Sequence, residues 1–118
     1  YLKNSDLAKI GDLYLHDGMW RGQQIVSKEW VKQSLTPFVS AGDDYDYGFK
    51  WWLLHRKDRK SYVWMGRGFG GQRLMVFPEE QLIAVFTGWD LEHEPEANSE
   101  LVSRILPAIR TQTCSGVD

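Results

Sequence analysis

The chain has 118 residues, and its 14 basic and 16 acidic side chains give a formal net charge of −2. This charge provides no field that would attract a polyanion, so nucleic acid is not expected as a partner. The single cysteine, Cys114, excludes an internal disulfide and a cysteine metal cluster.

A chain of this length is expected to hold one hydrophobic core. We predict a single domain over residues 1–110 and a disordered tail over residues 111–118, where apolar periodicity is absent. No apolar run reaches the roughly 20 residues that a membrane span requires, so no span is predicted. The first residues resemble neither a signal peptide nor an initiating methionine, which indicates a piece of a longer protein. The sequence indicates no cellular compartment.

The first predicted element is a helix over residues 6–16. Ser5 can cap its N-terminus, Asp6 stands at its positive end, and Asp17 with Gly18 provides the stop signal. Its apolar side chains recur at helical spacing: Leu7, Ile10, Leu13 and Tyr14.

A short second helix is predicted after an irregular connection over residues 19–26, which has Gly22 at a turn. Ser27 can cap this helix, and Pro37 ends it. It is expected to bury three apolar side chains: Trp30, Val31 and Leu35.

The apolar pattern then changes to a period of two, which predicts a strand over residues 47–54. Residues 62–66 are its expected partner, across a solvated hairpin tip formed by the basic run at residues 56–60. Residues 72–77 and 82–87 are joined by a connection short enough to require an antiparallel pair. The middle of the chain therefore predicts an antiparallel sheet of about four strands.

The last predicted element is a helix over residues 97–110. Leu101, Ile105 and Ile109 form an apolar stripe that is expected to pack on the sheet. Pro107 should kink this helix because it removes a backbone hydrogen-bond donor. Together these elements predict an α+β fold with two N-terminal helices, an antiparallel sheet and a C-terminal helix.

Four glycines stand among the six residues that begin at Gly66, between two predicted strands. Glycine weakens a strand, so this run indicates either a turn and bulge or a backbone that a ligand must approach without a Cβ in the way. The two interpretations are compatible. We expect Trp64 and Phe69, beside the glycines, to line a substrate cleft. Trp51 and Trp52 are adjacent on one strand and point to opposite faces, so core packing is expected of them.

Neither a metal nor a cofactor is predicted. His16, His55 and His93 do not have the spacing of metal ligands. The acidic residues within 43–46 lack the register of a calcium loop and are expected to be a solvated loop.

Several segments, taken together in their order and spacing, carry a resemblance to a known superfamily. They are residues 5–18, residues 20–31, residues 47–52, the run Gly66-x-Gly68-x-x-Gly71-Gln72, Pro78 and the apolar strand at residues 82–87. This ordered set resembles the C-terminal part of the serine β-lactamase-like hydrolases. That superfamily includes class C β-lactamases, D-alanyl-D-alanine carboxypeptidases, esterases and 6-aminohexanoate-dimer hydrolases.

The resemblance implies a helical lobe inserted into an α/β lobe, with a Ser-x-x-Lys serine as the nucleophile and a Tyr-x-Asn tyrosine that helps to move protons. Neither motif occurs in these 118 residues, and both would lie upstream of Tyr1. We therefore assign no catalytic residue and expect the chain alone to be inert, because a nucleophile needs an adjacent base. The predicted function is a cleft-wall segment of a serine-dependent amide or ester hydrolase. The alternative is a stand-alone noncatalytic binding module derived from that fold.

The superfamily's third motif, Lys-Thr-Gly or His-Thr-Gly, would fall near Gly66, Arg67 and Gly68, although a gap can slide it toward residues 62–64. Gly66 then replaces the cationic residue, which argues against β-lactam recognition, while a backbone N–H of the strand can still serve an oxyanion hole. Arg67 is either an anion-binding side chain or a plain surface arginine. The predicted substrate-binding residues are Trp64, Gly66, Arg67, Gly68 and Phe69.

The partner that the resemblance implies is a small-molecule amide or ester, bound by the complete protein. Strands that would pair with a missing N-terminal part leave open edges, and such edges predict association between copies of the chain.

Overall fold

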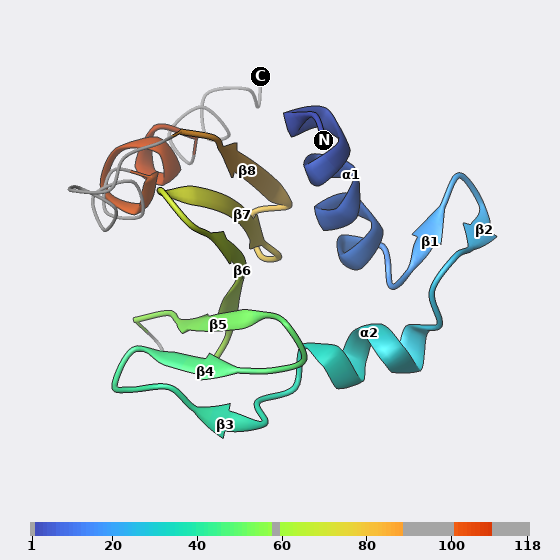
Figure 1. The fold of residues 1–118 in the computed structure, drawn as a ribbon, viewed down its shortest axis with the longest axis horizontal. Coiled ribbons are helices and arrows are strands. Elements are labelled where there is room, and N and C mark those ends of the chain that lie inside the picture. The colour runs from blue at the N-terminus through green and yellow to red at the C-terminus, as the bar shows by residue number, and fades with distance from the viewer. Residues whose placement is uncertain (1, 58–59, 89–100, 110–118) are drawn as a thin grey trace, which may run out of the picture.

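The structure, a computed structural model, describes residues 2–57, 60–88 and 101–109 (Figure 1). The chain begins with α1 (Asn4–Leu15), continues through the antiparallel pair of β1 (Met19–Trp20) and β2 (Gln23–Gln24), and then forms α2 (Lys28–Ser34). One antiparallel sheet follows, with its strands in chain order: β3 (Val39–Ser40), β4 (Tyr45–Tyr47), β5 (Trp52–His55), β6 (Tyr62–Gly68), β7 (Gln72–Phe77) and β8 (Leu82–Phe86). The α+β class is as the sequence predicts.

The sheet has six strands rather than about four. One reason is that the strand predicted over residues 47–54 is in fact two strands, because the chain reverses over residues 48–51. The Gly48 N–H donates to the Trp51 carbonyl across this turn over 2.9 Å. Alternating apolar side chains continue through the reversal, so the sequence pattern does not reveal it. The other additional strand, β3, has only two residues, which is too short for an alternating apolar pattern to be recognised in the sequence.

Close packing against α2 explains why the chain turns at Gly48. A Cβ at this position would lie 2.3 Å from the carbonyl oxygen of Ser34, the last residue of α2. The next backbone N–H, that of Phe49, donates to the same oxygen over 3.0 Å. Only glycine allows the two backbones to approach this closely.

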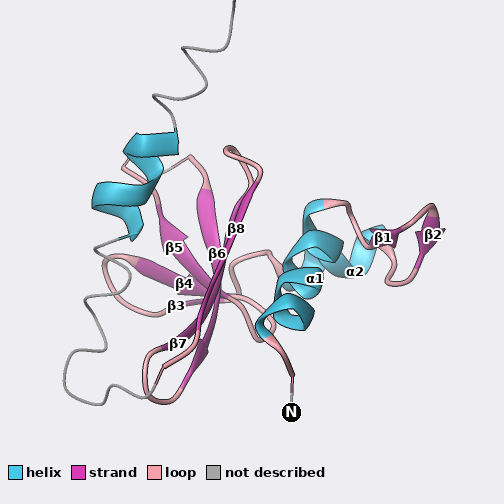
Figure 2. Ribbon diagram, turned by 90° about the horizontal axis from the view of Figure 1, so that it is seen from above, coloured by secondary structure: helices cyan, strands magenta, loops and turns pink. Residues whose placement is uncertain are grey.

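Helix α1 covers one face of the sheet, where it contacts β7 and β8 (Figure 2). Gly11 lies against the sheet, because a Cβ there would be 3.0 Å from the Val76 side chain and 3.1 Å from that of Ile83. On the same face, the ring of Tyr14 lies 4.8 Å from that of Trp51, which is buried as predicted. The helix begins at Asn4, two residues earlier than predicted, with Lys3 rather than Ser5 at the cap position.

The C-terminal helix covers the opposite face of the sheet (Figure 2). Leu106 is 6% exposed and packs against Val63, Met65, Met75 and Phe77. The predicted stripe is wrong at its centre, because Ile105 is 43% exposed.

A change of helix type accounts for this shift. Leu101–Ile105 forms a π-helix, and residues 106–109 form an α-helical turn. A π-helix bonds residue i to i+5 and adds a residue to the turn, so the side chain that faces the sheet moves from Ile105 to Leu106. The predicted helical residues 97–100 and 110, and the predicted tail, lie outside the described residues.

Residues 19–26, predicted to be irregular, contain the β1–β2 hairpin. Arg21 and Gly22 at its turn have φ values of 49° and 79°, as a two-residue hairpin loop with positive φ at both positions requires. The correct part of the prediction is the turn at Gly22.

Helix α2 begins as predicted, because the Ser27 side chain accepts the Trp30 backbone N–H over 3.1 Å. Val31 is buried, and Leu35 is half-buried just after the helix ends. The prediction that Trp30 is buried is wrong. Its ring is 46% exposed and stacks on Phe49, with 5.8 Å between ring centroids, so it packs on the turn after β4 rather than under the helix.

Candidate functional site

Strand β6 extends past the strand that pairs with it on one side. The pairing of β5 with β6 ends at Trp52 and Met65, whereas β7 stays paired with β6 as far as Gly68 and Gln72. No strand of the described residues continues the ladder along the β5 side of residues 66–68. Such an edge offers backbone N–H and C=O groups to an extended ligand. Within the described residues, the β5 side of β6 is therefore an open strand edge along residues 66–68.

The same glycines make the turn between β6 and β7. Gly70 and Gly71 have φ values of 80° and 86°, in the left-handed region that favours glycine. The buried Arg73 holds the turn together, since its Nη1 donates to the carbonyl of Gly68 over 3.3 Å and to that of Gln72 over 2.8 Å. The run is thus both a turn and a strand edge.

The predicted substrate-binding residues do not share one face of β6. Trp64 packs in the core cluster beneath α1. Arg67 lies on the opposite face, with its guanidinium carbon 5.3 Å from the centroid of the Trp52 ring. Phe69 is at the turn and is 71% exposed. The alternation of the strand sets the two glycines on the face of Trp64: Gly66 and Gly68.

A groove of about 280 Å³ runs beside the open edge. Its lining comes from α1, from the β4–β5 turn and from the β6–β7 hairpin: Leu7, Lys50, Gly66, Arg67, Gly68, Gln72, Arg73 and Leu74. Three of the five predicted site residues therefore lie along one groove, while Trp64 and Phe69 are not among its lining residues. Every charged side chain in this lining is cationic, which favours an anionic ligand.

Lys50 is one of the five lining residues that the sequence prediction lacks, with Leu7, Gln72, Arg73 and Leu74. Its backbone has a φ of 68°, which belongs to the turn between β4 and β5. Because the pattern of residues 47–54 predicts a continuous strand, it gives no sign that Lys50 stands at a turn beside the glycine run. The signal that could have placed it is the glycine at position 48, read as a point of close backbone approach.

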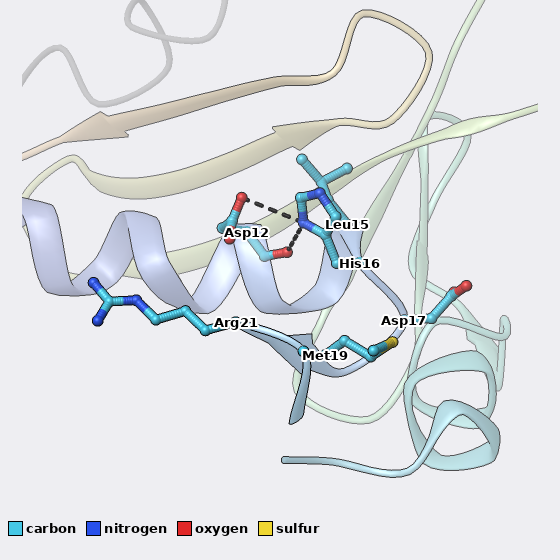
Figure 3. Close-up of a pocket in the computed structure, with 7 residues that line it drawn as sticks. Asp12, Leu15, His16, Asp17, Met19 and Arg21 are labelled. Carbon is cyan, nitrogen blue, oxygen red and sulfur yellow. Dashed lines mark hydrogen bonds and ion pairs between the residues drawn. The ribbon is translucent and has the colours of Figure 1, made fainter. Parts of the chain in front are cut away.

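A larger cavity of about 530 Å³ lies where α1 ends and β1 begins (Figure 3). Its titratable pair is His16 and Asp12: the ring Nδ1 lies 2.8 Å from the Asp12 carbonyl oxygen and 3.4 Å from its carboxylate. Both side chains are more than a third exposed, so solvent screens the pair. None of the seven lining residues is Ser, Thr or Cys, so the pair has no nucleophile to activate within this cavity.

Three polar side chains from β4, β5 and β6 form a cluster that the sequence does not predict. The Tyr62 hydroxyl donates to the Asp46 carboxylate over 2.7 Å, and the His55 Nε2 lies 3.2 Å from the same carboxylate oxygen. The hydrogen bond to this carboxylate, reinforced by burial and by its negative charge, raises the pKa of the Tyr62 hydroxyl. Tyr62 therefore remains a neutral donor at ordinary pH, and Asp46 is a structural acceptor within the sheet.

The basic hairpin is solvated only in part. Lys57 is exposed, as predicted. Arg56 is largely buried instead and pairs with Glu80 over 2.9 Å and with Glu79 over 3.6 Å. These two acids belong to the β7–β8 turn, so Arg56 joins two neighbouring hairpins. Residues 58–59 lie outside the described part of the chain.

Two further observations concern membranes and metals. Within the described ranges, no helix combines the length and the apolar character needed to cross a bilayer. The same ranges contain no group of three His, Cys, Asp or Glu side chains placed to hold a metal ion.

Comparison with known proteins adds one structural neighbour. No protein-family model matches the sequence. Among solved structures, the fold resembles that of a Bacillus anthracis protein assigned as a 6-aminohexanoate-dimer hydrolase, with a TM-score of 0.73 and 19% sequence identity. The match covers 97% of this chain and 30% of that chain, so this chain spans less than a third of its neighbour's length. The chain thus has a fold similar to that of one part of this neighbour.

Proposed function

We propose that this chain forms one wall of the substrate cleft in a serine-dependent amide or ester hydrolase of the β-lactamase-like superfamily. The observation that carries the proposal is the open edge of β6, which extends past Met65 and borders a groove with cationic lining. The likeness of the fold to part of a 6-aminohexanoate-dimer hydrolase supports it.

The nucleophile and its base lie outside these 118 residues, because the sequence contains neither Ser-x-x-Lys nor Tyr-x-Asn. This chain contributes backbone hydrogen-bond donors and the shape of one wall of the cleft. Substrate lies extended along residues 66–68, and a backbone N–H of this edge donates to the carbonyl oxygen as negative charge develops on it. Gly66 and Gly68 keep this edge accessible because no side chain projects from them.

The substrate is a small amide or ester that carries a negative group. Arg67 borders the groove, and a guanidinium binds a carboxylate through two parallel hydrogen bonds. The name of the structural neighbour refers to the dimer of 6-aminohexanoate. Such a dimer has one amide bond and one free carboxylate, which is the combination that a strand edge and a nearby cation would recognise.

The test is to express the complete reading frame that contains this chain beside the chain alone. We expect the complete protein to contain Ser-x-x-Lys and Tyr-x-Asn upstream of Tyr1, to hydrolyse a nitrophenyl ester and to be labelled by a serine-directed fluorophosphonate. The isolated chain should do neither, because electrostatic donors without a nucleophile give little covalent catalysis. A complete protein that folds without these motifs and without turnover would identify a noncatalytic binding module instead.

A further inference from the structure

A second groove, which we call the helix–hairpin groove, runs between α1 and the β1–β2 hairpin. It holds about 280 Å³, and four of its five lining side chains are large and apolar: Ile10, Leu13, Trp20 and Ile25. The fifth, Lys9, already has an acidic partner within α1, because its Nζ lies 3.1 Å from the Asp6 carboxylate. The helix–hairpin groove is therefore an apolar surface whose one charged lining residue is paired.

Solvent reaches this apolar surface. Ile10 is 38% exposed on the α1 side of the groove, and Ile25 is 57% exposed on the hairpin side. Single exposed apolar side chains are common, but a groove that gathers them from two elements is typical of an interaction site. Among the described residues, most exposed large apolar side chains lie in the first third of the chain: Leu2, Ile10, Met19, Ile25, Trp30, Phe38 and Val39.

Hydrogen bonds fix the hairpin to the end of α1. The Gly18 carbonyl accepts the backbone N–H of Ile25 over 2.9 Å and that of Val26 over 3.2 Å. The Gln24 side-chain amide donates to the carbonyls of Asp17 and Val26 over 2.7 and 2.6 Å. A two-stranded hairpin alone is only marginally stable, so these bonds at its base hold it beside the helix. The groove thus keeps its shape while its apolar rim stays exposed.

The composition of the groove favours a permanent partner over a transient one. Charged groups steer the encounter of separate proteins, whereas obligate interfaces are more apolar. The structural neighbour indicates where a permanent partner can come from, because the match covers 97% of this chain and only 30% of that chain. In the proposed hydrolase, the remainder of the polypeptide is therefore more than twice as long as this chain.

We propose that the helix–hairpin groove is an interface with that remainder, and that an uncharged apolar segment outside residues 1–118 covers Ile10 and Ile25. The inference rests on the proposed function, which places this chain in a longer protein. It concerns a different surface, because this groove shares no lining residue with the groove beside the strand edge. Burial of its apolar side chains stabilises the contact through the hydrophobic effect.

The experiment compares thiol labelling in the complete protein and in this chain alone. Ile10→Cys and Ile25→Cys place a thiol on either side of the groove, in a background where Cys114 and any cysteine of the remainder are replaced by serine. Asp43→Cys, at an exposed position outside the groove, is the matched control. Circular dichroism establishes that each variant is folded.

We expect a maleimide to label both groove positions readily in the isolated chain. In the complete protein their labelling should be slower by more than about tenfold, because a covered position reacts only when the contact opens. Labelling of the control position should change much less between the two proteins.

Equal labelling of the groove positions in the two proteins would overturn the proposal and leave a free surface. Protection that already exists in the isolated chain and grows with its concentration would also overturn it, because the occupant would then be a second copy. Turnover by a complete protein with fully labelled groove positions would retain the hydrolase and remove this interface. Protected positions in a complete protein without turnover would retain the interface and remove the hydrolase.

Discussion

Trp52 and Met65 form the last pair that joins β5 to β6, whereas β6 remains paired with β7 as far as Gly68. Within the described residues, β3, β4 and β5 therefore end before the glycine run, where the sheet continues only through β6, β7 and β8. Gly48 sets this limit, because the turn that it begins delays β5 until Trp52. A packing contact between α2 and a turn thus determines where the edge of the candidate site becomes accessible.

Gly48 should tolerate substitution poorly. A Cβ there would overlap the Ser34 carbonyl oxygen at 2.3 Å, and that atom belongs to a helix end that cannot rotate away. We expect Gly48→Ala to lower the free energy of unfolding by about 3 kcal/mol or more, as for an overpacked core. Gly88→Ala is the control, because among the described residues, its chain neighbours aside, no atom lies within 4 Å of a Cβ at Gly88. Similar urea midpoints for the two variants would contradict this packing.

Leu106 should contribute much more to stability than Ile105. Leu106 lies in the core cluster under the sheet, whereas Ile105 is 43% exposed. Leu106→Ala should cost about 2–5 kcal/mol, and Ile105→Ala should cost less than about 1 kcal/mol. Chemical denaturation of the two variants measures the difference. If Ile105→Ala proves the more damaging change, the helix packs through the stripe at Leu101, Ile105 and Ile109 after all.

Tyr62 should stabilise the fold in a pH-dependent way. Its pKa is raised above the ordinary value of 10.0 in the folded state, chiefly by its hydrogen bond to Asp46. A raised pKa contributes stability that is present below pH 10.0 and is lost as the pH rises through the folded value. Tyr62→Phe should therefore cost about 1–2 kcal/mol at neutral pH and progressively less above about pH 10.

The matched control for this titration is Asp46→Asn. Replacing the carboxylate removes the largest cause of the raised pKa and leaves burial, so the cost of Tyr62→Phe in that background should vary less across the alkaline range. A cost of Tyr62→Phe that stays constant with pH in the unmodified chain would show that the hydroxyl does not titrate differently on folding.

Strand β8 should promote association between copies of the chain. It is the last strand of the sheet among the described residues, and its five residues, Leu82–Phe86, include no charge and no proline to protect the edge. Sedimentation velocity should show a weight-average mass that rises with concentration. Ala84→Lys, which introduces a charge on this edge strand, should reduce that rise. A clean monomer over a wide concentration range would indicate that the edge is covered.

The parts of the fold that follow from short-range chemistry could be predicted from the sequence. Ser27 predicts the start of α2, because a serine side chain at this position accepts a hydrogen bond from the backbone N–H three residues ahead. β7 and β8 contain apolar runs on either side of a short turn, and the short connection between them requires an antiparallel pair. The glycine run is also a local signal, because its composition alone indicates a turn or an accessible backbone.

The parts that depend on distant contacts could not be predicted. The reversal at Gly48 depends on the end of α2, and the alternation of residues 47–54 is the same whether the chain reverses or not. Leu106, rather than the predicted Ile105, faces the sheet because residues 101–105 form a π-helix. A prediction from the 3.6-residue period of an α-helix does not reveal this shift. Lys50 joins the groove only once three separate segments are assembled, so no single motif contains the site.

The central claim, that residues 66–68 form a substrate edge, is tested most directly by Gly68→Val in the complete protein. The measurement is kcat/KM for a neutral nitrophenyl ester, with circular dichroism to establish that the variant is folded and Gly88→Val as the control. We expect turnover to fall by about 100-fold or more, because a side chain at Gly68 obstructs the substrate beside the backbone donors. Full activity in a folded Gly68→Val enzyme would contradict the assignment of β6 as the edge of the cleft.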